Sequence, residues 1–180
     1  MRERNSMTIP DGLPTLSAGG HAVGSGFACA MEYVSVLAGE EWSDRPSCTY
    51  EGLYGMVWSA NDHLPDDERH IMLPLIPRLV GARPGRMTNE EAIQFVADFD
   101  EADHRLREVH FSERGSVCDL PGFDCTGSVE GPQPACPSEE YDFLVAMLDW
   151  FDERIGRTPD DYTVTDDDVR VAARVVAALA

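Results

Sequence analysis

Cysteine, histidine and carboxylate side chains recur at two places in this chain, and both sets could supply ligands to a metal ion. The first set is His21, Cys29, Glu32 and Cys48, and the second is His110, Cys118, Cys125 and Cys136. Cys29 and Glu32 are three residues apart, so on a helix they would project from one face. Thiolate, imidazole and carboxylate ligands suit zinc or iron. A Cys₃His zinc site would also explain how the second segment stays ordered with little apolar content.

Neither set has the two-residue cysteine separation of a zinc finger, so a structural alternative stays open for each. In the first set, Cys29 and Cys48 would be small core residues and Glu32 would hold a loop amide. In the second, the thiols would lie exposed on a loop, or two of them would form a disulfide. A weaker pattern joins Glu101 to His104, at the spacing that di-iron bundles use. Its further members would be Glu108 and the pair Asp67 and His70, which has the same three-residue spacing with aspartate in place of glutamate. The simpler expectation for all of these residues is that they lie on a solvated helix face.

Nucleophilic and phosphate-binding motifs are weaker still. Ser25 stands between Gly24 and Gly26, which is shorter than the five-residue elbow that presents an activated serine. A phosphate-binding loop needs a lysine or a strand–helix context, and the chain contains no lysine. We therefore identify no catalytic residue, and we expect no resident cofactor unless a cysteine set binds zinc.

The charge of the chain is strongly negative: 14 arginines stand against 33 carboxylates, which gives a net charge of −19. Such a surface argues against direct binding of nucleic acid or anionic lipid. It serves solubility, or it meets a basic protein surface, including a nucleic-acid-binding cleft that it would occupy by mimicry. The carboxylates concentrate in residues 90–113 and 139–168. The residues that we expect to contact a partner are Trp42, Asp44, Asp160, Asp161, Asp166 and Asp167.

The elements that must position these residues are helices. A length of 180 residues suits one domain, and apolar spacing predicts five to six helices in an irregular all-α bundle. We expect helices over 27–38, 49–62, 65–80, 88–111, 138–155 and 165–179, with Pro74 and Pro77 kinking or dividing the third. Thr88 and Glu91 form a predicted capping box. Residues 1–26 should be an extended arm before a single helical domain at 27–180, and 115–137 should be a Gly/Pro/Cys-rich loop or small lobe.

The region from Leu13 to Val80 carries a distinctive string of short motifs over a little more than a third of the chain. The motifs are Gly24-Ser25-Gly26, Cys29 to Glu32, Leu37 to Glu40, Trp42 to Asp44, Pro46, Cys48, Asn61-Asp62, Leu64 to Asp66, Arg69 and Pro74 to Val80. This string resembles a family of small, uncharacterised proteins from actinobacteria and their bacteriophages. The resemblance implies no particular activity, and it fits the lysine-free composition.

An odd number of cysteines without a secretory signal indicates a reducing compartment. We expect a cytoplasmic protein, acting in the host cytoplasm if a phage encodes it, with no membrane contact. The function we expect is that of a non-enzymatic interaction factor with a protein partner that carries a basic surface. The alternative is a zinc- or iron-binding protein that uses one of the cysteine sets.

Overall fold

The computed structural model describes residues 13–111, 137–162, 170 and 176, and this part of the chain is mostly helical, as expected. The α-helices are α1 (Ala30–Leu37), α2 (Tyr54–His63), α3 (Ile76–Leu79), α4 (Asn89–Phe111) and α5 (Pro137–Ile155). Short 3₁₀ turns are η1 (Glu51–Leu53), η2 (Arg69–Leu75) and η3 (Pro159–Tyr162). Strand β1 (Thr15–Leu16) pairs in parallel with β2 (Phe27–Ala28), with Thr15 opposite Phe27.

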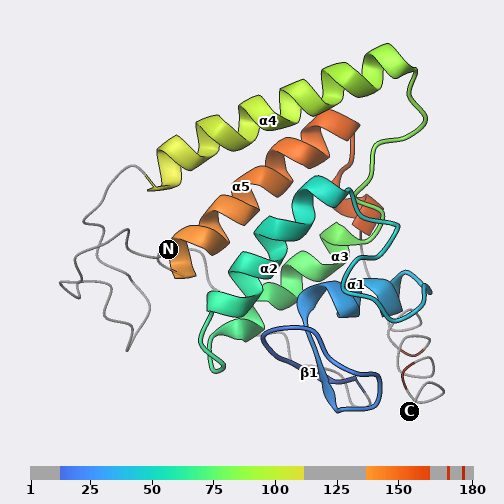
Figure 1. Cartoon of the computed structure of the whole chain (residues 1–180), viewed down its shortest axis with the longest axis vertical. Coiled ribbons are helices and arrows are strands. Elements are labelled where there is room, and N and C mark those ends of the chain that lie inside the picture. Colours follow the sequence, from blue (N-terminus) through green and yellow to red (C-terminus); the bar gives the residue numbers. More distant parts are fainter. Residues whose placement is uncertain (1–12, 112–136, 163–169, 171–175, 177–180) are drawn as a thin grey trace.

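The helices lie in successive layers, with α5 between α4 and α2 and with α1 on the far side of α2 (Figure 1). Helix α3 packs against α1 and also reaches α5 through Arg78. Helix α4 is the outermost of these helices and packs on α5 (Figure 1). A helix at the edge of a bundle buries one stripe of side chains and leaves the others in solvent. The layering therefore gives α4 an outer face with no neighbouring helix among the described residues.

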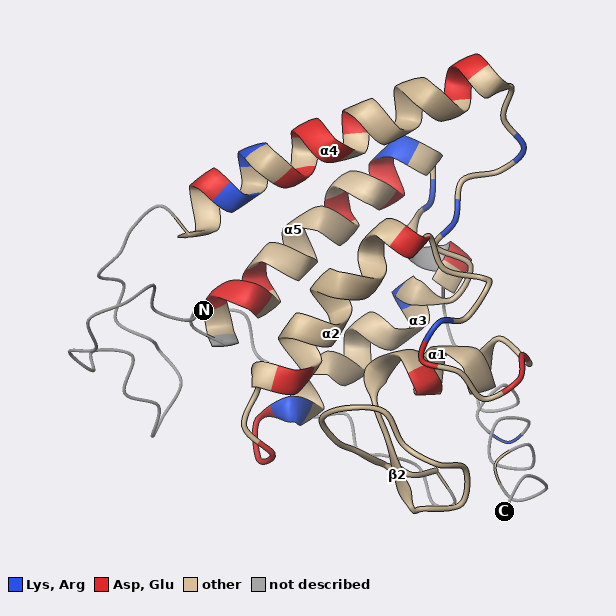
Figure 2. Cartoon of the chain, in the orientation of Figure 1, with Lys and Arg blue, Asp and Glu red and all other residues tan. Residues whose placement is uncertain are grey.

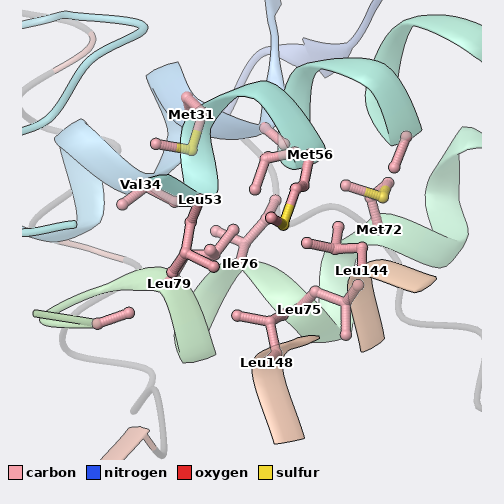
Figure 3. Close-up of a cluster of buried hydrophobic side chains, with 14 of the residues drawn as sticks. Met31, Val34, Leu53, Met56, Met72, Leu75, Ile76, Leu79, Leu144 and Leu148 are labelled. Atoms are coloured by element: carbon pink, nitrogen blue, oxygen red, sulfur yellow. The ribbon is translucent and has the colours of Figure 1, made fainter. Parts of the chain in front are cut away.

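The core lies between α1, α2, α3 and α5, where aliphatic and methionine side chains interdigitate (Figure 3). Met31, Leu53, Ile76 and Leu148 are almost completely buried there. Burial of such side chains away from water is the main favourable contribution to folding. A second, aromatic part of the core seats α4.

In the aromatic part, the Tyr50 ring stands edge-on to Phe95 and Phe99 of α4, at centroid distances of 5.3 and 5.1 Å. Gly52 lies beneath these rings. A Cβ atom at that position would stand 2.6 Å from the Tyr50 ring and 2.9 Å from the Phe99 ring. The glycine, which weakens the helical pattern in the sequence, is thus needed for α4 to approach this closely.

Two arginines tie α3 to the C-terminal end of α5. Arg78 donates to both Asp149 and Asp152 at 2.8 Å, and Arg157 donates to the carbonyls of Arg78 and Val80 at 2.8 and 3.0 Å. Asp152 is buried, and a buried charge needs a partner of opposite sign. The guanidinium groups of Arg78 and Arg157 lie beside its carboxylate and compensate its charge. The short helix α3 is held in place by the neighbouring α5.

Most of the predicted helices are confirmed, with two differences. Thr88 and Glu91 form the predicted capping box, and the proline-rich stretch divides into η2 and α3. Pro65, however, accepts turn hydrogen bonds from Glu68 and Arg69 and does not open a helix. The second difference is that Leu16 of the expected surface arm is buried in the core, because the pairing of β1 with β2 draws it inward.

Three predictions fall mostly or wholly outside the described residues. They concern the loop at 115–137, of which only Pro137 is described and begins α5, residues 1–12 of the arm, and most of the last helix, of which Arg170 and Val176 are helical. None of the helices in the described ranges has the length and apolar character required to traverse a membrane.

Candidate functional site

Three members of the first cysteine set, His21, Cys29 and Glu32, meet at the start of α1, where Cys29 and Glu32 build a helix cap. Cys29 occupies the N-cap position with an extended backbone, and its Sγ accepts a hydrogen bond from the Glu32 amide at 3.4 Å. In return, Glu32 Oε2 accepts from the Cys29 amide at 2.7 Å. These reciprocal bonds satisfy two of the donors that every helix leaves unpaired at its N-terminus. Burial raises the pKa of the Cys29 thiol from 9.0 to about 12, so this sulfur is a protonated thiol near neutral pH.

Glu32 also fixes the loop between β1 and β2. Its Oε1 accepts from the His21 amide at 2.6 Å, and its Oε2 lies 3.1 Å from His21 Nδ1. The Glu32 side chain is only 3% exposed. Its carboxylate is contacted by the His21 amide, His21 Nδ1 and the Cys29 amide. A buried carboxylate of this kind is stable only with such partners. The structure thus gives Glu32 the role of holding loop amides.

We name the polar cluster of His21, Cys29 and Glu32 the α1 cap. Side chains from neighbouring elements extend it. Trp42 Nε1 donates to the His21 carbonyl at 2.9 Å. Asn61 of α2 accepts from the Ala30 amide at 3.2 Å and donates to the Ser17 carbonyl at 3.0 Å. Sequence reasoning missed the part played by Asn61, although an amide that can donate and accept at once is suited to bridging two segments.

The candidate metal ligands converge only in part. His21, Cys29 and Glu32 come together as described, whereas the Cys48 sulfur lies 3.8 Å from the Thr49 hydroxyl in a contact of its own. Across residues 13–111 and 137–162, no group of three or more His, Cys, Asp or Glu side chains is arranged to hold a metal ion. In the second set, the His110 ring packs edge-on against Phe143 at 6.3 Å. Cys118, Cys125 and Cys136 lie outside the described residues.

The weaker di-iron pattern falls on exposed helix surface. His104 lies 3.9 Å from Glu108, and both are more than two-thirds exposed. His70 Nδ1 donates to the Asp67 carbonyl at 2.8 Å, and both residues are exposed.

The residues predicted to contact a partner divide between structural and exposed positions. The Trp42 ring is half-buried in the α1 cap, while Asp44 is exposed. Asp161 accepts from the amide and the hydroxyl of Thr158 at 2.6 and 2.9 Å, and these hydrogen bonds lower the pKa of its carboxyl group. Asp160 belongs to η3. Asp166 and Asp167 lie outside the described residues.

The apolar side chains that mark α4 in the sequence divide between its two faces. Phe99 is buried against α5 together with Phe95. Ile93, Val96 and Val109 are 73%, 47% and 65% exposed. Phe95 and Phe99 occupy the buried face of α4 because their rings pack against Tyr50 and bury more area than the aliphatic side chains would.

Acidic groups line the same helix, as Figure 2 shows. Residues 89–111 carry seven carboxylates and two arginines. Asp98 and Asp103 pair with Arg154 and Arg107, at 2.8 Å each. Asp100 and Glu101 are exposed, and their carboxylates make no hydrogen bond or ion pair with any described residue.

A hollow of about 570 Å³ lies along the C-terminal half of α4. Its described lining is Asp100, Asp103, His104, Arg107, Glu108 and Phe111. Arg107 is paired with Asp103, so the carboxylates of Asp100 and Glu108 and the ring of Phe111 are the parts of this lining that favour a cationic occupant with an apolar part. The α1 cap is therefore a structural cluster with its polar groups mutually satisfied, whereas α4 offers a surface on which charges and apolar groups remain available.

In comparisons with known proteins, the chain matches no family model, no curated protein and no solved structure.

Proposed function

We propose that this chain is a non-enzymatic protein-interaction factor of the cytoplasm and that its acidic surface, chiefly the outer face of α4, binds a protein with a basic surface. One observation carries the proposal: a 23-residue helix at the edge of the bundle keeps exposed carboxylates beside exposed Ile93 and Val96. Exposed apolar groups beside unpaired charges are typical of interaction surfaces.

The net charge of −19 supports a basic partner. It would steer a positively charged surface toward the chain and repel nucleic acid and anionic lipid. The resemblance of Leu13–Val80 to small proteins of actinobacteria and their bacteriophages makes a basic protein of such a cell the partner that we propose.

The test is affinity capture with the full-length chain from a lysate of its source cells, at about 50 mM and about 500 mM salt. Proteins with basic surfaces should be retained at the lower concentration and lost at the higher one, because salt screens exposed charges. Capture that is equal at both concentrations, or the absence of any reproducible basic protein, contradicts the proposal.

Elemental analysis of the same purified chain separates this function from the metal-binding alternative. A stoichiometric amount of zinc or iron, lost on Cys29→Ser or Cys125→Ser, would favour the alternative. A chain that is fully folded without metal would favour the interaction factor.

A further inference from the structure

The outer face of α4 has a regular spacing that bears on the shape of its partner. Ile93, Ala97, Asp100, His104 and Glu108 follow one another at steps of four, three, four and four residues, so they line one side of the helix. All five are exposed, and the buried rings of Phe95 and Phe99 lie on the opposite side. We name these five residues the outer stripe. Steps of three and four residues are the spacing with which one helix packs along another.

The outer stripe has two chemically different halves. Its N-terminal half is apolar, with Ile93 and Ala97 flanked by exposed Val96. Its C-terminal half carries the carboxylates of Asp100 and Glu108, which line the hollow, and Glu101 follows Asp100 in the helix. Arg107, which also lines the hollow, is paired with Asp103. An occupant that covers the whole stripe must therefore be apolar at one end and cationic at the other.

Charge complementarity decides between the candidate occupants. A second copy of this chain would bring another net charge of −19 and another acidic α4, so the two faces would repel. Nucleic acid and anionic membranes are repelled for the same reason. A protein segment with lysine or arginine side chains is attracted, and its apolar side chains can cover Ile93 and Val96.

Resting on the proposed function, we propose that the outer stripe is the docking site for a basic amphipathic helix of another protein. Apolar side chains of this helix pack on Ile93 and Val96, and its basic side chains reach Asp100, Glu101 and Glu108. The stripe extends over about 22 Å at 1.5 Å per residue, which corresponds to about four helical turns of the partner. Recognition of an amphipathic helix through side chains at these steps is a recurring mode of binding.

A synthetic helical peptide of about 20 residues provides the probe. Leucine at alternating steps of three and four forms its apolar half, and arginine at the same steps forms its basic half. A peptide with glutamate in place of each arginine, and one of the same composition in scrambled order, serve as controls. Fluorescence anisotropy with the full-length chain measures binding, and we expect the first peptide alone to bind.

Three variants of the chain locate the site. Ile93→Glu should weaken binding about 30-fold, because it removes an apolar contact and buries a charge. The double variant Asp100→Arg, Glu101→Arg should weaken it at least about tenfold and flatten its salt dependence. Val109→Glu is the matched control: it changes an exposed valine of the same helix outside the outer stripe, and affinity should stay within about twofold.

Circular dichroism and thermal unfolding establish that each variant is folded before its affinity is interpreted. Equal binding of the arginine and glutamate peptides, or unchanged affinity in folded Ile93→Glu, would overturn the docking site. So would a dimer in analytical ultracentrifugation that Ile93→Glu dissociates, because the occupant would then be a second copy. If salt-sensitive capture from lysate persists in both α4 variants, the chain still binds a basic protein, but through another part of its acidic surface, and the docking site on α4 fails.

Discussion

The α1 cap and the outer stripe of α4 use the same kinds of residue in opposite ways. In the α1 cap, Glu32 is 3% exposed and its carboxylate accepts from the His21 and Cys29 amides. On α4, Asp100 and Glu101 are exposed, and their carboxylates form no hydrogen bond or ion pair with a described residue. A carboxylate removed from water is costly unless hydrogen bonds or cations compensate it, whereas one in water is satisfied by solvent and remains available to a partner. Residue type alone therefore does not separate a structural cluster from an interaction surface; burial and partners do.

The largest effect that would test this contrast is expected from Glu32→Ala. It leaves the His21 and Cys29 amides without their acceptor, so we expect a loss of about 3–5 kcal/mol in the free energy of unfolding. Chemical denaturation measures the change, and Glu101→Ala on α4 is the matched control, with an expected change within about 0.5 kcal/mol. Similar effects of the two substitutions would show that the α1 cap is not the structural cluster described above.

A smaller effect concerns the thiol of the α1 cap at alkaline pH. Because burial raises the pKa of Cys29 from 9.0 to about 12, the unfolded chain releases this proton at lower pH than the folded chain does. Its contribution to stability is thus complete below about pH 9 and is lost as the pH rises toward 12, by roughly 1 kcal/mol per pH unit. Denaturation between pH 8 and about pH 11 measures the slope. The slope should be shallower in Cys29→Ala; an unchanged slope would assign it to other groups.

Trp42 joins the α1 cap to the loop that was predicted to contact a partner. Trp42→Phe keeps most of the apolar ring and removes the hydrogen bond from Nε1 to the His21 carbonyl. We expect a loss of about 1 kcal/mol in stability, with little change in peptide binding at α4. If Trp42→Phe instead leaves stability intact and abolishes binding, the partner contacts the α1 cap and the contrast between the two regions fails.

Local signals in the sequence were sufficient for the helical class and for most helix positions. The Thr88–Glu91 pair predicted the start of α4. Gly39, with a φ of 70°, closes α1, and a glycine in this position is a common local signal for the end of a helix. The burial of Leu16 could not be predicted in this way. It depends on the pairing of β1 with β2, two strands of two residues each that lie ten residues apart, and such short strands carry no period.

The candidate sites were less accessible to sequence reasoning. The three-residue step from Cys29 to Glu32 predicted their proximity, and it also matches the spacing of a capping box, which is what the structure contains. On α4, both Ile93 and Phe95 are apolar, and only the neighbouring Tyr50 and Phe151 rings decide which of them is buried. Because that choice is made by residues distant in sequence, a single helix pattern could not reveal the outer stripe.

The smallest expected effect on stability is also informative for the outer stripe. Ile93 is 73% exposed, so Ile93→Glu should change the free energy of unfolding by no more than about 0.5 kcal/mol. Phe95→Ala, two residues away on the buried side, should cost about 3 kcal/mol and serves as the comparison. Thermal and chemical unfolding of both variants provide the measurement. A large loss for Ile93→Glu would mean that another part of this chain covers Ile93 and that the outer stripe contributes to the fold. If Ile93→Glu leaves the free energy of unfolding almost unchanged and still weakens peptide binding, Ile93 acts in recognition. Its side chain then contributes to the complex with the peptide and not to the stability of the fold.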